Sequence, residues 1–212
     1  MMLPLAPEGR PYVTLSAVVV AGSHVLLAPQ LAWPSWILLA ATLFLFRDFS
    51  REITPKALAV VSPVDGVVTE VAETRDPYLG RPARRVSIRQ SLLGEFNVHS
   101  PVEGKVHERW WPGKEGVKDD VPPEEFAVWV QTDEGEDVVF AVELGSRFRF
   151  LRCGIQSGER MGQGRRCGFL GFGLPVHTYL PQNSRVEVSA GQRVRAGSDI
   201  IGVLIRKQSE DN

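Results

Sequence analysis

A duplicated turn sequence is the feature that most limits how this chain can fold. Residues 62–68 read SPVDGVV and residues 100–106 read SPVEGKV. A second pair behaves in the same way, because residues 158–164, GERMGQG, return as residues 191–197, GQRVRAG. Glycine is useful in such turns because it accepts a positive φ without a Cβ clash. The chain is therefore predicted to contain duplicated hairpin units.

From residue 57 onward the apolar residues come in short runs rich in valine, isoleucine and phenylalanine. Examples are residues 57–61, 126–131, 137–144 and 199–205, and glycine, proline, asparagine and aspartate separate such runs at intervals typical of strands. No segment here keeps a helical period. The pattern predicts an all-β domain, either an antiparallel barrel or a sandwich.

The repeated segments also resemble the two ends of biotinyl- and lipoyl-type domains, in which two hairpin-rich halves interlock as a barrel-sandwich hybrid. The resemblance implies that fold for residues 57–212, with a carrier protein as one function. A carrier needs an exposed lysine at a tight turn between the halves. Neither a Met-Lys-Met nor an Asp-Lys-Ala sequence is present, so the carrier hypothesis is set aside.

Residues 1–56 have a different character. Two apolar runs, residues 12–28 and 31–46, contain no charged residue and are separated by Pro29 and Gln30. At about 1.5 Å per residue, a run of roughly 16 residues extends about 24 Å, against roughly 30 Å for the hydrocarbon core of a bilayer. We expect a membrane-associated helical hairpin, either as two thin spans or as a re-entrant pair, followed by the β domain.

The flanks of this hairpin predict its orientation. Basic residues lie at both ends and tryptophans lie near the turn: Arg10, Arg47, Arg51 and Lys56, and Trp33 and Trp36. Both ends should therefore face the cytoplasm, at the cell membrane. Two alternatives stay open. A secretory signal peptide would have one arginine as its charged region and would not be followed by a second apolar run; the other alternative is a buried hairpin of a soluble protein.

Charge and cysteine content exclude several classes of function. Lys plus Arg total 24 against 25 Asp plus Glu, a net charge of −1, so nothing favours nucleic-acid binding. Cys153 and Cys167 match neither a zinc motif nor a disulfide framework, and the four histidines lack metal-binding spacing. We predict a reduced cytoplasmic setting and no metal.

Five further motifs follow the apolar hairpin in a fixed order. They are FLFRDFSREITP at 44–55, VVSPVDGVV at 60–68, FNVHSPVEGKV at 96–106, GFGLPVHTYLP at 171–181 and GQRVRAGSDIIGVL at 191–204. Over nearly the whole chain, this order resembles a short, prokaryotic-type phosphatidylserine decarboxylase. Members of that family are proenzymes that cut themselves at a Gly-Ser bond, and the serine becomes a pyruvoyl group. The resemblance implies conversion of phosphatidylserine to phosphatidylethanolamine and CO2, with the pyruvoyl carbonyl as electrophile.

Two residues match positions that carry chemistry in the family. Asp65 in SPVDG matches the aspartate implicated in self-cleavage, and His99 in FNVH matches the histidine that serves cleavage and the active site. An imidazole can relay protons near neutral pH, and a nearby carboxylate can orient it. Two plainer roles stay open: Asp65 as a cap of its own turn, and His99 as a buried, hydrogen-bonded core residue.

The resemblance breaks at the cleavage position. Relatives read close to F-G-S-x-V-x-x-Y-L-P, whereas here Gly173 is followed by Leu174. Leucine has no β-oxygen to attack the preceding carbonyl, so we predict that no ester and no pyruvoyl group forms there. Relatives also continue V-N-R after the motif histidine, whereas here Ser100 follows His99 directly. The loop beside the predicted site is therefore shortened.

Other features leave some room for activity. Gly145-Ser146 offers another Gly-Ser bond and Cys167 could lose sulfide, although neither matches the family's cleavage position. Trp110 and Trp111 could lie at a membrane interface or pack on the barrel. Arginine clusters could hold an anionic lipid head group or belong to strands with one wet face: Arg81, Arg84, Arg85 and Arg89, and Arg147, Arg149 and Arg152.

Two functions of different classes follow. One is a membrane-bound phospholipid decarboxylase that obtains its electrophile elsewhere, which the presence of Asp65 and His99 favours. The other is a non-catalytic homologue that binds a membrane phospholipid or a partner, such as an active decarboxylase or a second copy of itself. Leu174 and the short loop favour the second function.

Overall fold

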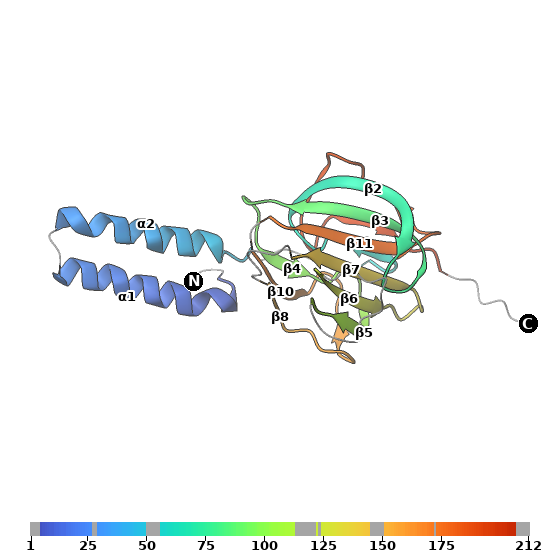
Figure 1. Cartoon of the computed structure of the whole chain (residues 1–212), viewed down its shortest axis with the longest axis horizontal. Coiled ribbons are helices and arrows are strands. Elements are labelled where there is room, and N and C mark those ends of the chain that lie inside the picture. Colours follow the sequence, from blue (N-terminus) through green and yellow to red (C-terminus); the bar gives the residue numbers. More distant parts are fainter. Residues whose placement is uncertain are drawn as a thin grey trace, which may run out of the picture. The chain divides into compact units, whose positions relative to one another are not determined.

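The computed structural model describes residues 5–26, 29–49, 56–112, 122, 124–144, 151–171 and 173–206. The chain divides into two compact units, Met1–Ser50 and Arg51–Asn212. The first is helical, and the regular elements described in the second are all strands (Figure 1). The predicted fold class, an all-β barrel-like domain preceded by an apolar helical hairpin, is confirmed.

The helical unit is an antiparallel pair whose polar side chains meet between the helices. A short 3-10 turn, η1 (Pro7–Gly9), leads into α1 (Arg10–Leu26), which packs on α2 (Pro29–Leu45). The hydroxyls of Ser16 and Thr42 lie 3.0 Å apart, and those of Ser23 and Ser35 lie 2.9 Å apart. Such hydroxyl pairs join helices closely and satisfy groups that would be costly to leave unpaired in an apolar setting.

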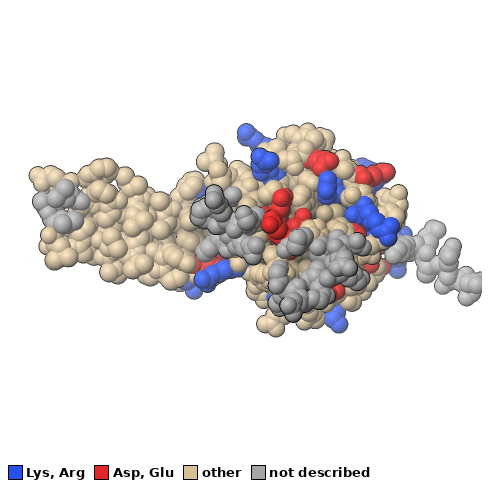
Figure 2. Space-filling view, in the orientation of Figure 1, with Lys and Arg blue, Asp and Glu red and all other residues tan. Residues whose placement is uncertain are grey.

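The large apolar side chains of the hairpin face outward. Exposed members include Leu15, Val18, Val25, Trp33 and Ile37. Charged side chains are almost absent from the visible surface of the helices, whereas both signs are mixed over the β domain (Figure 2). Polar groups inside and apolar groups outside reverse the pattern of a helix pair in water. Within the described residues, no helix has both the length and the apolar character needed to cross a bilayer.

Fourteen strands, all paired antiparallel, lie in the described part of the second unit. An eight-stranded sheet has the order β13-β2-β3-β11-β7-β6-β5-β9, and two three-stranded sheets have the orders β1-β14-β12 and β4-β10-β8. The large sheet curls so that β2, β3, β11 and β7 follow one another around the domain (Figure 1). The bounds are β1 (Ala59–Val61), β2 (Gly66–Asp76), β3 (Arg81–Gln90), β4 (Asn97–His99), β5 (Gly104–Trp110), β6 (Glu125–Gln131), β7 (Asp137–Glu143), β8 (Leu151–Cys153), β9 (Arg160–Met161), β10 (Arg166–Leu170), β11 (Pro175–Pro181), β12 (Arg185–Val186), β13 (Arg193–Val194) and β14 (Ile200–Val203).

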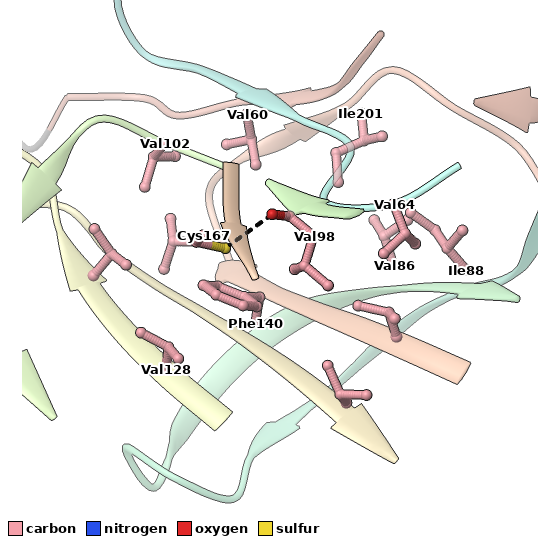
Figure 3. Packing of buried hydrophobic residues seen from close by; sticks show 14 of the residues in the cluster. Val60, Val64, Val86, Ile88, Val98, Val102, Val128, Phe140, Cys167 and Ile201 are labelled. Atoms are coloured by element: carbon pink, nitrogen blue, oxygen red, sulfur yellow. Dashed lines mark hydrogen bonds between the residues drawn. The ribbon is translucent and has the colours of Figure 1, made fainter. Parts of the chain in front are cut away.

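The core lies inside the curl of the large sheet. Valines and isoleucines from all three sheets meet there around Phe140, among them Val60, Val98, Val128 and Ile201 (Figure 3). β-Branched side chains suit this position because they pack well on a pleated surface and lose little rotamer freedom there.

A second apolar cluster covers the other face of the large sheet. Trp110 is buried in it, with its ring centroid 5.0 Å from that of Tyr78. Trp111 lies 4.6 Å from the ring of Phe126. Both tryptophans therefore pack on the barrel, which is the plainer of the two roles predicted for them.

The duplicated sequences fold into equivalent turns. The Ser62 hydroxyl donates to the Val64 carbonyl and the Ser100 hydroxyl donates to the Val102 carbonyl, both at 2.7 Å. The second pair of repeated sequences, residues 158–164 and 191–197, contacts these two turns in an equivalent way. Gly197 N donates to Ser62 O and Gly164 N donates to Ser100 O, both at 2.8 Å. The two copies are therefore equivalent turns, as their sequences predict. The prediction that they are hairpin units is wrong, because each turn joins strands of different sheets: β1 pairs with β14 whereas β2 pairs with β3, and β4 pairs with β10 whereas β5 pairs with β6.

The two copies are also joined to each other. Val61 N donates to Pro101 O at 2.9 Å, and His99 N donates to Pro63 O at 2.8 Å. Each copy therefore fixes the residue that precedes the other copy. His99 occupies that position in one copy and Val61 occupies it in the other.

Candidate active site

Asp65 ties three distant segments together. Its carboxylate is almost fully buried, and its oxygens accept hydrogen bonds from Ala196 N at 2.7 Å and from Glu95 N at 3.0 Å. Its own carbonyl accepts from Ser91 N at 2.8 Å. A buried carboxylate needs such donors because desolvation penalises its charge. Asp65 therefore does more than cap its own turn.

His99 is held at both ring nitrogens. Nδ1 lies 2.7 Å from the carbonyl oxygen of Gly164, and Nε2 lies 3.1 Å from Oε1 of Glu95. A carbonyl can only accept, so Nδ1 carries a hydrogen. A second hydrogen bond then joins Nε2 to the Glu95 carboxyl group, which is fully buried. This arrangement can take up or release a proton at a fixed point, as a general acid–base pair does.

Glu95 is the site residue that the sequence did not reveal. It precedes the FNVH motif, and its side chain extends along β4 to reach His99. Its second oxygen lies 3.5 Å from Asn97 Nδ2, and Arg166 Nε donates to Asn97 Oδ1 at 2.8 Å. The one signal in the sequence was a carboxylate directly before a short apolar strand. The pairing of β4 with β10, which places Arg166 opposite His99, could not be read from that signal.

Gly173 and Leu174 contact Gln90, at the start of the segment that leads from β3 to Glu95. Gln90 N donates to Leu174 O at 3.2 Å, and the Gln90 side chain accepts from Gly173 N at 3.2 Å. Gly173 has a φ of 65°, which favours glycine. Residues 90–95, which run from the last residue of β3 toward β4, therefore contact every predicted site residue: Gln90 contacts Gly173 and Leu174, Ser91 and Glu95 contact Asp65, and Glu95 contacts His99.

The side chain at position 174 has no reactive group. Leu174 is half-buried and packs against the main apolar cluster. It carries no oxygen or sulfur that could attack the Gly173 carbonyl, so the residue present does not fit a pyruvoyl precursor.

Two other positions, Gly145-Ser146 and Cys167, were considered as precursors of a pyruvoyl group. Gly145-Ser146 lies outside the described residues, as do Arg147 and Arg149. Cys167 is buried in the core, where its thiol donates to the Val98 carbonyl at 3.2 Å (Figure 3). Burial raises the pKa of Cys167 well above its ordinary value, so the reactive thiolate is strongly disfavoured.

The arginines of β3 mainly form ion pairs with the neighbouring strand. Arg84 pairs with Glu73 at 3.1 Å and Arg85 pairs with Glu70 at 2.7 Å, each across to β2. Arg89, nearest the candidate site, has no ion pair among the described residues. In the same part of the chain, no three His, Cys, Asp or Glu side chains are arranged to hold a metal ion.

Comparison with known proteins identifies the family. The phosphatidylserine decarboxylase family model matches residues 38–202. The chain belongs to the phosphatidylserine decarboxylase family. It is 37% identical over 208 residues to the phosphatidylserine decarboxylase proenzyme of Burkholderia pseudomallei strain 1106a, covering 94% of this chain and 95% of the relative.

Further relatives give the same result. The proenzymes of Burkholderia mallei strain SAVP1 and Burkholderia ambifaria strain MC40-6 are each 36% identical over 208 residues, and the alignments cover 95% and 96% of those proteins. No solved structure gives a significant match. The phosphatidylserine decarboxylase family uses a pyruvoyl group, and the assignment of Asp65, His99 and Leu174 to the motif positions of the family stays a prediction.

Proposed function

We propose that this chain is a phosphatidylserine decarboxylase-like protein of phospholipid metabolism that stays uncleaved and binds a phospholipid head group without decarboxylating it. One observation carries the proposal: an intact Asp65–Glu95–His99 network lies on the segment that also holds a leucine at the cleavage position. The proton-handling groups are present and the nucleophile is not.

The chemistry of self-cleavage explains why leucine blocks it. The serine hydroxyl must attack the preceding carbonyl, and the resulting ester must lose its acyl group by β-elimination. Leu174 cannot begin that sequence, whatever His99 and Glu95 do with their proton. The network then stabilises the fold by joining residues 90–95 to the duplicated turns at residues 62–68 and 100–106, the SPV turns.

A small hollow beside the network suits an anionic head group. It has a volume of about 190 Å³ and is lined by Arg165, Arg166 and Glu159, among others. Arg166 also donates to Asn97, which lies against Glu95. Guanidinium groups bind phosphate well, and this chain of contacts would connect a bound phosphate to His99.

The helical hairpin supports a membrane setting for this function. Its hydroxyls pair inside and its apolar side chains face outward, which favours burial in lipid over exposure to water. We place the protein at the cytoplasmic side of the cell membrane, where its phospholipid ligand resides. Association with an active decarboxylase or a second copy of the chain is a further partner hypothesis.

Intact-mass measurement tests the proposal. Protein purified from its native host should be one chain of 23.5 kDa with an N terminus that does not react with hydroxylamine. Binding of soluble short-chain phosphatidylserine to the detergent-solubilised protein should be weakened several-fold by Arg166→Gln. Two fragments and a pyruvoyl mass, or release of CO2 from labelled phosphatidylserine, would establish the decarboxylase alternative instead.

Replacing Leu174 tests whether the nucleophile alone is missing. We expect Leu174→Ser to cleave slowly into residues 1–173 and 174–212, because the proton-handling groups are in place. Leu174→Ala is the matched control, since it removes the same packing without adding a hydroxyl. Cleavage of the serine variant should disappear when Asp65→Asn is added. An uncleaved serine variant would show that the shortened loop after His99 has also disabled the site.

A further inference from the structure

Two adjacent leucines are exposed at the edge of the candidate site. Leu92 and Leu93, between β3 and β4, are 60% and 82% exposed. Among the described residues of the β domain, the other exposed large apolar side chains are Val71 and Ile205, which stand alone. Exposing two neighbouring leucines is unfavourable unless something apolar covers them.

The turn that carries these leucines is firmly anchored. Ser91 N and Glu95 N both donate to Asp65, at 2.8 and 3.0 Å. Within the turn, Leu93 N donates to the Ser91 hydroxyl at 3.2 Å and Gly94 N donates to Ser91 O at 3.3 Å. The leucines are therefore presented by a fixed turn whose two ends are both held by Asp65, one by its backbone carbonyl and the other by its buried carboxylate.

Unpaired positive charge lies beside the turn. Arg193, Val67, Arg89 and Pro175 are register partners across β13, β2, β3 and β11. Because neighbouring strands lie about 4.8 Å apart, the two arginines stand about 10 Å apart on one face of the sheet. Both are exposed, and neither has an ion-pair partner among the described residues, in contrast to Arg84 and Arg85.

We propose that residues 91–94 dock the β domain onto an anionic phospholipid surface. Leu92 and Leu93 enter the boundary between head groups and acyl chains, and Arg89 and Arg193 contact lipid phosphates. The inference builds on the proposed function, because it delivers lipid to the same site. A Cβ at Gly173 would lie 3.2 Å from Leu92, so docking brings the head-group layer to positions 173 and 174.

The size of the patch favours lipid over a protein partner. A stable protein interface buries roughly 1,200–2,000 Å² in total and usually centres on aromatic or arginine anchors in a packed pocket. Two leucines on a narrow turn offer far less area. Insertion into a bilayer has no such threshold, since each buried apolar group and each nearby cation adds its own contribution.

A fluorescent probe on the full chain tests the docking directly. Leu93→Cys, in a Cys153→Ser background, would carry an environment-sensitive dye, and vesicles of phosphatidylglycerol and phosphatidylcholine would carry brominated acyl chains. Phosphatidylglycerol is anionic but lacks the serine amine, so the docking is measured separately from head-group recognition at the site. We expect a blue shift and at least twofold quenching at position 93.

The matched control is Ile205→Cys in the same background, an exposed aliphatic position at the far end of β14, where Leu204 pairs with Leu58. It should show neither effect. A dye at position 93 that stays unquenched while the protein floats with the vesicles would overturn the inference, because the helical hairpin alone would then be holding the chain.

The arginines give a second arm of the test. Quenching at position 93 should fall several-fold on pure phosphatidylcholine vesicles, and on anionic vesicles when Arg89→Gln and Arg193→Gln are combined. Equal quenching on both lipids would remove the arginines from the inference. A wild-type dimer in detergent that becomes a monomer on Leu93→Glu would assign the leucines to a second copy of the chain and overturn lipid docking.

Discussion

The two copies of the duplicated turn share their backbone and differ in their chemistry. Both serine hydroxyls bond two residues ahead, and both turns receive a glycine N–H from the second repeat. Asp65 is buried with two backbone donors, whereas its counterpart Glu103 is exposed and lies 3.8 Å from Arg160. His99 meets Glu95, whereas its counterpart Val61 lies in the core region.

This difference shows how two turns with the same backbone conformation acquire different chemistry. The SPV turns fix the backbone of both copies, and a few substitutions in one copy add a buried acid network. The unmodified copy then serves as an internal control: a change that depends on the backbone alone should affect both copies equally, and a change to the network should affect one.

The largest effect is expected from making the two copies alike at His99. His99→Val leaves the buried Glu95 carboxyl without its partner, and such a loss costs about 3 kcal/mol of unfolding free energy. Urea unfolding in detergent, followed by near-ultraviolet circular dichroism, would measure it. Adding Glu95→Leu should recover most of the loss, because removing both partners is far cheaper than removing one. A mild single variant would mean that the pair contributes little.

A smaller effect is expected at the aspartate. Asp65→Ala leaves the N–H groups of Glu95 and Ala196 without their acceptor and should lower the free energy of unfolding by about 2 kcal/mol. Glu103→Ala, at an exposed position, should lower it by less than about 0.5 kcal/mol. The same denaturation experiment compares them. Equal costs would contradict the claim that the two copies differ in their energetics.

The smallest effect should be the same in both copies. Gly158 and Gly191 have φ values of 89° and 88°, and a Cβ at either would meet nothing within 4 Å. Each change to alanine should therefore cost about 1 kcal/mol through backbone strain alone. Thermal melts of the two variants should coincide. A clear difference between them would break the equivalence of the repeats.

Much of the fold was predictable because its signals are local. The repeats at residues 62–68 and 100–106 indicated equivalent local structures, which are turns between sheets and not hairpins, and the uncharged runs at residues 12–28 and 31–46 indicated two helices. Asp65 and His99 were found through motif resemblance. Glu95 was missed, because its burial and its partner depend on β4 pairing with β10, which is distant in the sequence.

The sequence by itself determined the family, the all-β class, the apolar hairpin and the absence of a hydroxyl at position 174, since each follows from residue identity or short-range pattern. Only the tertiary structure decided that residues 90–95 join the predicted site residues, that Glu95 is hydrogen-bonded to His99, and that two leucines stand exposed beside them. Those facts depend on strand pairing between distant segments, and burial and partner choice are set by that packing.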